Sequence, residues 1–296
     1  MNFRSLRSQI ESGAGQGHLD NYVPMWQLTR GNCTYFGVQA TGPMPGYRRA
    51  SCFRQRQDRI AALIALWIGG MDARENFPLW PFPHPHPLSD WPLGKPTERM
   101  CQGLMDLASD EHERKLLRRR AHEGYVPEAT LNITYGERDC PQSCLLACVR
   151  ATSKLAAAIP DSDGDIARAQ TYAMANDMRF FRFDRRHFNR TLVSNLEVWS
   201  FSVNTIRRDV ELDLVKRVED LLLRRLEVDT PCNAVNLASS QLAIPALTAW
   251  TVLRYMQWQQ TVDVDPRRYI SHLEHFVPGG RAFRASLRSL ILGVTP

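Results

Sequence analysis

The spacing of apolar residues predicts helices along most of this chain. The clearest is a helix from 206 to 227, because apolar residues three or four positions apart share one face of a helix. Its apolar positions are Ile206, Val210, Leu214, Val218 and Leu222. A second helix, from 59 to 68, has apolar residues around its whole axis, Asp58 at the capping position and Gly69-Gly70 after its end. We therefore expect this second helix to be buried on most sides.

The same reasoning predicts further helices and a few strands. The helices are expected at 97–107, 109–122, 141–158, 166–174, 236–260 with a bend near Pro245, 266–276 and 281–292. Alternating polar and apolar residues at 130–135 predict a half-buried strand. A second strand is expected at 34–41, and the β-branched and aromatic residues of 192–203 favour a third, which would pair with 130–135. The fold class is accordingly α+β, predominantly helical, with a small β element.

The prolines suggest a division of the chain. Seven of the 18 prolines lie between residues 78 and 96, and alternating prolines cannot continue a helix or an inner strand. We expect three parts: an N-terminal mixed region at 1–77 that contains the buried helix 59–68, a proline-rich extended strap at 78–97, and a mainly helical domain at 98–296.

Three aromatic residues are candidate anchors of this strap, namely Trp80, Phe82 and Trp91. Two interpretations of the strap stay open. It either lies along a neighbouring subunit, as an extended polyproline-like arm, or packs against its own domain as an intramolecular linker.

Composition points to a folded, basic, arginine-rich protein. The chain has 296 residues, 44% of them hydrophobic, and a formal net charge of +6, which suits RNA, DNA or an acidic protein surface as a partner. Among its 37 basic residues, only Lys95, Lys115, Lys154 and Lys216 are lysines. The arginine bias either serves binding or reflects the nucleotide composition of the gene.

One short segment concentrates this chemistry. Between 179 and 190, arginines at Arg179, Arg182, Arg185, Arg186 and Arg190 alternate with Phe180, Phe181, Phe183 and Phe188. Guanidinium groups fork onto phosphates and stack on aromatic rings, so the segment is a candidate site for a nucleic acid or a protein partner. The alternative is structural, with the phenylalanines in the core and the arginines paired with acids such as Asp177 and Asp184.

A second basic group lies at the end of the helix expected at 109–122. It contains Arg118, Arg119 and Arg120, which either form a binding patch or complement the negative end of the helix dipole.

Cysteine usage and hydropathy suggest a location. Seven cysteines, an odd number, point to free thiols in a reducing compartment, and the longest apolar run has nine residues where a membrane span needs about 20. We expect a cytoplasmic protein, or one within a particle assembled in the cytoplasm, with no membrane contact. If 141–158 is helical, Cys140, Cys144 and Cys148 are too far apart to share a zinc ion, so we expect no metal and no other cofactor.

A five-residue segment resembles a known nucleophile motif. Gly31-Asn32-Cys33-Thr34-Tyr35 is similar to the Asp-Gly-Asn-Cys-x-aromatic signature of ovarian-tumour-type deubiquitinating cysteine proteases, although Arg30 replaces the aspartate. The resemblance implies Cys33 as the nucleophile and His275, which precedes Phe276, as its base.

Taken together, these patterns favour binding over catalysis. The leading hypothesis is a non-catalytic structural subunit of a large particle, a virus capsid or a ribonucleoprotein, that binds neighbouring protein subunits and RNA through its arginine-rich surfaces. The alternatives are the cysteine protease and a monomeric RNA-binding protein.

Overall fold

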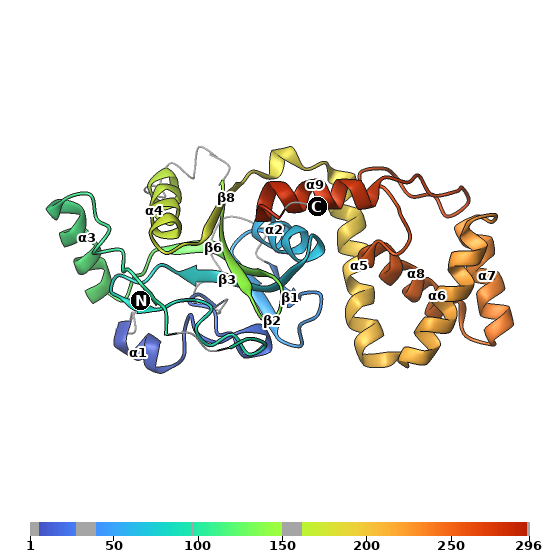
Figure 1. Cartoon of the computed structure of the whole chain (residues 1–296), viewed down its shortest axis with the longest axis horizontal. Helices are drawn as coiled ribbons and strands as arrows, with labels where there is room; N and C mark the ends of the chain where they lie inside the picture. The colour runs from blue at the N-terminus through green and yellow to red at the C-terminus, as the bar shows by residue number, and fades with distance from the viewer. Residues whose placement is uncertain (1–5, 28–39, 96–97, 150–161, 295–296) are drawn as a thin grey trace. The chain divides into compact units, whose positions relative to one another are not determined.

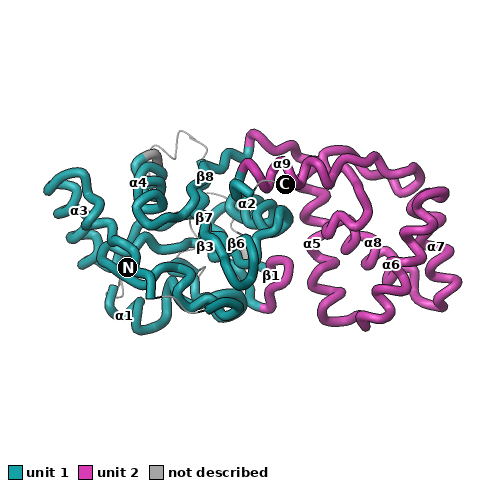
Figure 2. Tube along the Cα trace, viewed as in Figure 1, with its two compact units in different colours: residues 1–43, 49–185, 291–294 teal, residues 44–48, 186–290, 295–296 magenta. Residues whose placement is uncertain are grey.

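The computed structural model describes residues 6–27, 40–95, 98–149 and 162–294 (Figure 1). It divides into two compact units (Figure 2). Unit 1 contains residues 1–43, 49–185 and 291–294, and unit 2 contains residues 44–48, 186–290 and 295–296. With 47% helix and 16% strand, the fold is the predominantly helical α+β class that the sequence predicts.

The two units do not follow the predicted division of the chain. Residues 78–95 of the expected strap lie inside unit 1, and the main division falls between Arg185 and Arg186.

A four-stranded sheet organises unit 1. Its strands are β3 (Gly70–Pro78), β6 (Glu128–Gly136), β7 (Pro141–Cys148) and β8 (Arg179–Phe183), and they lie in this order. The first three pair antiparallel, whereas β8 runs parallel to β7. A parallel neighbour requires a crossover connection, and α4 (Ser162–Ala175) lies in that connection.

Helix α2 (Arg56–Trp67) precedes β3 and confirms the buried helix expected at 59–68. Its N-terminus is closed by a capping box, in which Gln55 is the cap and Asp58 is the third helical residue whose carboxylate accepts the Gln55 N–H. Gly69, with φ of 108°, then turns the chain directly into β3.

The remaining elements of unit 1 are short or peripheral. They are α1 (Leu6–Glu11), η1 (Leu19–Asn21), the hairpin of β1 (Ala40–Pro43) and β2 (Ala50–Phe53), the pair of β4 (His84–Pro85) and β5 (Met100–Cys101), and α3 (Glu111–His122). α3 begins at an Asp110 cap, whose side chain accepts a hydrogen bond from the Glu113 N–H, and agrees with the helix expected at 109–122.

The core of unit 1 lies where α4 covers the sheet. It is built mainly from the large side chains Phe77, Leu79, Leu117, Leu145 and Tyr172, all nearly inaccessible. The burial of this apolar surface holds β3, β7, α3 and α4 together.

The proline-rich segment packs on its own unit. Its backbone is hydrogen-bonded on both sides, with Leu104 N–H donating to Trp80 O at 2.9 Å and Leu79 N–H donating to Pro127 O at 2.8 Å. The indoles of Trp80 and Trp91 are buried within unit 1, and Phe82 remains 38% exposed. Of the three expected anchors, only Phe82 is therefore exposed enough to contact a neighbouring subunit.

The central surprise of unit 1 is the polarity of β3. Four polar or charged residues of this strand are buried: Asp72, Arg74, Glu75 and Asn76. Each has partners. One enclosed pair joins Arg49 to Glu75, with Nη1 and Nη2 of Arg49 at 2.6 and 2.8 Å from the two carboxylate oxygens.

A second buried cluster ties the N-terminal segment to the same strand. The ring of His18 has Nδ1 at 3.2 Å from Asp72 Oδ2 and Nε2 at 3.0 Å from Asp90 Oδ1. The Leu19 N–H also donates to Asp72. Burial acts to raise the pKa of Asp72, but the His18 hydrogen bond and the charge of Arg74 outweigh it and leave this pKa below its ordinary value.

Unit 2 is helical in its described residues. Its helices are α5 (Arg190–Asp209), α6 (Leu212–Leu226), α7 (Pro231–Leu242), α8 (Ala246–Gln259) and α9 (Gly280–Leu292), the last of which ends in residues assigned to unit 1. Fully buried side chains from α6, α7 and α8 form its core, among them Val218, Leu222, Val235, Leu253 and Met256.

Four expectations about secondary structure are wrong. Residues 192–203, expected as a strand paired with 130–135, lie inside α5, because Leu192, Leu196, Trp199, Val203 and Ile206 share its buried face. The helix expected at 141–158 begins instead as strand β7, and 97–107 holds the short strand β5. No helix forms at 266–276.

Two of the long helices expected from the sequence are each divided into two helices in the structure. The expected helix 206–227 is interrupted after Asp209, so that α5 ends and α6 begins there. The expected helix 236–260 is divided at Ala243, which has φ of 51°, and Pro245 caps the second half. Most of the strand expected at 34–41 lies outside the described residues.

The Arg49–Glu75 pair gives the first prediction. Replacing Arg49 with Met should lower the free energy of unfolding by about 3–5 kcal/mol, because the Glu75 carboxylate, with only 1% of its side chain exposed, would lose its charged partner. The double variant Arg49→Met/Glu75→Gln should recover part of that loss. Urea unfolding followed by circular dichroism measures both, and a single-variant loss below about 1 kcal/mol would mean that the pair behaves as an ordinary surface ion pair.

The second prediction concerns acid. His86 is buried and accepts the Leu88 N–H at Nδ1, and burial, aided by the nearby charge of Arg99, lowers its pKa to about 4. Between pH 6.5 and 4 the unfolded chain therefore binds a proton here that the folded chain does not, so stability falls as the pH falls, by about 2–3 kcal/mol. Burial lowers the pKa of His84 as well, which adds a change of the same sign.

Urea midpoints measured from pH 7 to 4.5 test this acid sensitivity. The variant His86→Gln should flatten the dependence, while His112→Gln, at an exposed position of α3, should leave it unchanged. The lowered pKa of Asp72 does not interfere, because its stabilising effect is lost only below the ordinary aspartate value of 3.8. An unchanged slope in His86→Gln would show that this imidazole is protonated equally in both states.

Candidate nucleic-acid interface

The segment 179–190 is divided between two roles. In β8, Phe183 is buried and Phe180 packs against the core of unit 1, whereas Arg179 and Arg182 are exposed. The phenylalanines of this strand thus contribute to the core rather than to an external stacking surface. The arginines have to be considered one at a time.

Arg179 closes the end of a helix. Its Nε donates to the carbonyl of Ile291 at 2.8 Å, in the last turn of α9, where backbone carbonyls lack partners within the helix. Its guanidinium also lies so close to Gly293 that a Cβ there would meet Nη1 at 2.4 Å. A structural role accounts for this arginine.

Three other arginines of the segment face solvent without such a role. Arg182, Arg185 and Arg190 are exposed, and no hydrogen bond or ion pair joins their side chains to another residue in the described part of the chain. Of the two acids expected to pair with the arginines of this segment, Asp177 instead binds Arg99, and Asp184 contacts a residue other than these three. Arg186 is also exposed, and it does contact another residue.

Helix α5 begins with a cation where an anion is favoured. Arg190 is its first residue, and its first turn has no acidic side chain. Because the helix dipole places partial positive charge at this end, the arginine adds to that charge instead of neutralising it. Asn189 caps the helix by accepting the Leu192 N–H at 2.7 Å, and the start of α5 remains a position where a phosphate would be stabilised.

Two more arginines are held against the start of α5. The Asn189 side-chain amide donates to the carbonyl of Arg267 at 3.1 Å. Six residues further along the chain, the Asn195 amide donates to the carbonyls of Pro266 at 2.8 Å and Arg268 at 3.0 Å. These bonds fix the segment 266–268 beside the helix within unit 2. We call Arg190, Arg267 and Arg268 the α5 patch.

The arginines of the α5 patch differ in freedom. Arg267 forks onto Asp265 with distances of 2.9 and 2.8 Å and lies over the ring of Phe283, so its orientation is fixed. That hydrogen bonding lowers the pKa of Asp265, with burial opposing it, and keeps the carboxylate ionised. Arg268 approaches the same carboxylate only to 3.9 Å and keeps 67% of its side chain exposed.

Further arginines of unit 2 serve the fold. Arg281 and Arg284 donate to the carbonyls of Gln260 and Gln259, both at 2.8 Å, and so satisfy the C-terminal end of α8. Burial, with the like charge of Arg288 beside it, lowers the pKa of Arg284.

The predicted basic group on α3 is also divided. Arg119 lies 4.0 Å from Glu123, and the Arg120 guanidinium covers the ring of Tyr125 at 5.4 Å. Arg118 is exposed and has no hydrogen-bond or ion-pair partner among the described residues. All three stand in the last turns of the helix, where cations complement the dipole.

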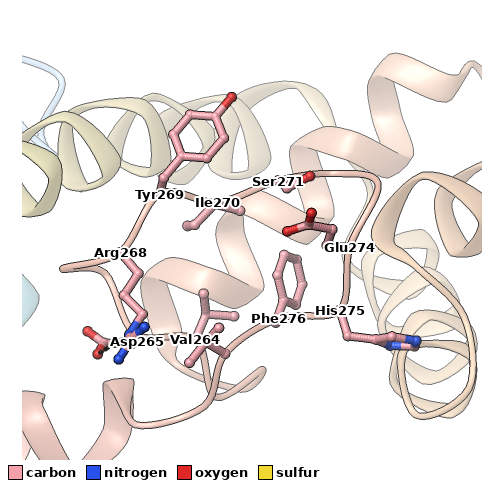
Figure 3. Close-up of a pocket in the computed structure, with 10 residues that line it drawn as sticks. Val264, Asp265, Arg268, Tyr269, Ile270, Ser271, Glu274, His275 and Phe276 are labelled. Atoms are coloured by element: carbon pink, nitrogen blue, oxygen red, sulfur yellow. Dashed lines mark ion pairs between the residues drawn. The ribbon is translucent and has the colours of Figure 1, made fainter.

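The structure does not test the cysteine-protease hypothesis. Cys33 lies outside the described residues, and His275 is an exposed residue of the loop between α8 and α9 (Figure 3). The pair Cys33 and His275 therefore stays a prediction.

The cysteines outside the Cys33 segment include a deeply buried thiol. Burial raises the pKa of the Cys144 thiol to about 12, so this thiol stays protonated. Across the described ranges, no three histidine, cysteine or acidic side chains are placed to hold a metal ion.

Comparisons with known proteins add no assignment. The sequence matches no model of a known protein family and no curated protein. In the part of the chain that the structure describes, every helix is too short or too polar to cross a membrane.

The amide bonds of Asn195 give the third prediction. Replacing Asn195 with Ala removes two hydrogen bonds to the segment 266–268 and should cost about 1–3 kcal/mol of local stability. Hydrogen exchange measured by mass spectrometry should then speed up at residues 266–277. The control is Asn236→Ala on α7, an exposed asparagine whose amide contacts Cys232 of its own helix, and equal exchange in both variants would show that the loop is held by other contacts.

Proposed function

We propose that this protein binds nucleic acid as a subunit of a larger protein assembly. The phosphate backbone supplies most of the affinity of such an interaction, and guanidinium groups that are free to approach phosphates are what it needs. The proposal combines the two partners that the sequence favours, nucleic acid and neighbouring subunits.

The observation that carries the proposal is the set of unpaired arginines. Arg182, Arg185 and Arg190 follow one another within nine residues of chain, and within the described part of the structure their charges are not matched by any ion pair. Other arginines of this protein have structural work, such as Arg179 at α9 and Arg49 at Glu75. Three arginines that are close in sequence, exposed and without partners among the described residues are well suited to an external anion.

Exposed apolar side chains favour the assembly part of the proposal. Val198 and Phe201, three residues apart on α5, are 46% and 64% exposed and so lie on the same outer face of that helix. Leu212 and Leu247 are 71% exposed elsewhere in unit 2. Apolar area of this kind is typical of surfaces that meet another protein.

The salt dependence of binding is the fourth prediction. Fluorescence anisotropy with labelled single strands and duplexes of RNA and DNA should show a dissociation constant that rises steeply with salt. Replacing Arg182, Arg185 and Arg190 together with Ala should weaken binding to all sequences and reduce the logarithmic salt slope by roughly one for each lost phosphate contact.

The control removes three charges from another part of the chain. Arg217, Arg224 and Arg225 lie on α6, and their replacement with Ala should leave the slope unchanged. Native mass, measured by light scattering with and without nucleic acid, tests assembly in the same samples. Weak binding with a flat salt slope in the unaltered protein would reject nucleic acid as the partner, and a monomer under both conditions would reject the assembly.

A further inference from the structure

The loop between α8 and α9 presents an aromatic ring to solvent in an unusual way. Tyr269 is 87% exposed, more than any other large apolar or aromatic side chain in the described ranges. It directly follows Arg267 and Arg268 of the α5 patch. In Figure 3 its ring projects away from the loop, while Phe276 and Glu274 point into the space that the loop encloses.

The backbone beneath this ring is fixed in place. On its N-terminal side, the Asn195 amide holds the carbonyls of Pro266 and Arg268. At the base of the loop, the Asp265 N–H donates to Val277 O at 2.8 Å and closes the two ends upon each other. Burying such a ring in the core would stabilise the fold, so its rigid exposure calls for another explanation.

A hollow lies beside the tyrosine. It encloses only about 40 Å³ and is lined by Val264, Ile270 and Phe276 together with the polar residues Arg268, Ser271 and Glu274. The hollow is too small for a base, so a base would stack on the outside of the loop. An exposed ring for stacking and a neighbouring guanidinium for a phosphate are the parts that an unpaired nucleotide requires there.

We propose that the loop 264–277 binds an unpaired nucleotide of a single-stranded nucleic acid, with Tyr269 stacking on a base and Arg268 meeting the phosphate. This inference rests on the proposed function and names the part of unit 2 that takes a base. Charge favours an anionic occupant: Arg190 begins α5 and Arg268 is held beside it with 67% of its side chain exposed, whereas Asp265 neutralises Arg267. Base stacking adds an attraction that salt does not screen.

The fifth prediction compares two replacements of the same ring. Tyr269→Ala should weaken the binding of a single strand about tenfold, since stacking on an aromatic side chain is lost, whereas Tyr269→Phe should bind like the unaltered protein. Both variants should keep the salt slope of the unaltered protein, because no charge changes. Leu273→Ala, an apolar residue of the same loop that is 75% exposed, is the matched control and should have no effect.

A scan with abasic strands makes the test specific. When an abasic residue replaces the base that stacks on Tyr269, the unaltered protein should lose about as much affinity as Tyr269→Ala loses with the intact strand. The two changes together should cost no more than either one alone.

The outcomes separate this inference from the proposed function. If the unaltered protein binds no nucleic acid, both are rejected. If it binds with a steep salt slope but Tyr269→Ala binds equally well, the function stands and the stacking role of Tyr269 is rejected. A change of native mass in Tyr269→Ala without a change of affinity would also reject it, since the ring would then contact a protein subunit.

Discussion

The sheet of unit 1 depends on charges that are buried and matched. Strand β3 carries Asp72, Arg74 and Glu75 into the interior, where an unpaired charge costs several kcal/mol, so each must find a partner before the strand can be covered. Glu75 finds Arg49, and Asp72 finds His18. Both partners come from segments outside the four-stranded sheet, which explains why the chain before α2 folds back over β3 although its own elements are short. The pairing selects one arrangement of these segments, as apolar contact alone would not.

Arginine recurs in this protein as a partner for groups that the fold would otherwise leave unsatisfied. Arg49 neutralises a buried carboxylate, Arg179 binds a carbonyl at the end of α9, and Arg281 does the same at the end of α8. The fork of five donors on a long apolar stem suits all three tasks. A high arginine content is therefore no evidence of nucleic-acid binding by itself. The informative arginines are those that remain after these structural partners have been assigned.

The sequence predicts the elements whose burial pattern is simple. Helices α2 and α3 and strand β6 lie where the spacing of apolar residues predicts them. Strand β3 escapes prediction because its charged residues look like a solvated segment, and only the partners far away in the sequence make their burial possible. The β-branched and aromatic content of residues 192–203 predicts a strand, although their apolar residues keep the helical period of α5. For the candidate site, the sequence shows the arginine segment directly. It does not show the loop of Tyr269, because the pattern of residues 266–276 predicts a helix there.

The fixed and the free side chains of unit 2 suggest how a strand would be held. Arg267 is locked by Asp265 and Phe283, so it contributes geometry and little additional charge, while Arg190 and Arg268 keep the freedom to follow phosphates. Tyr269 stands on a backbone that hydrogen bonds already hold in place, so little backbone entropy remains to be lost when a base stacks on its ring. Salt-sensitive attraction and salt-insensitive stacking are thus carried by different residues on one short loop. An increase in ionic strength would loosen the strand from the arginines first and leave the aromatic contact as the part of the interaction that persists.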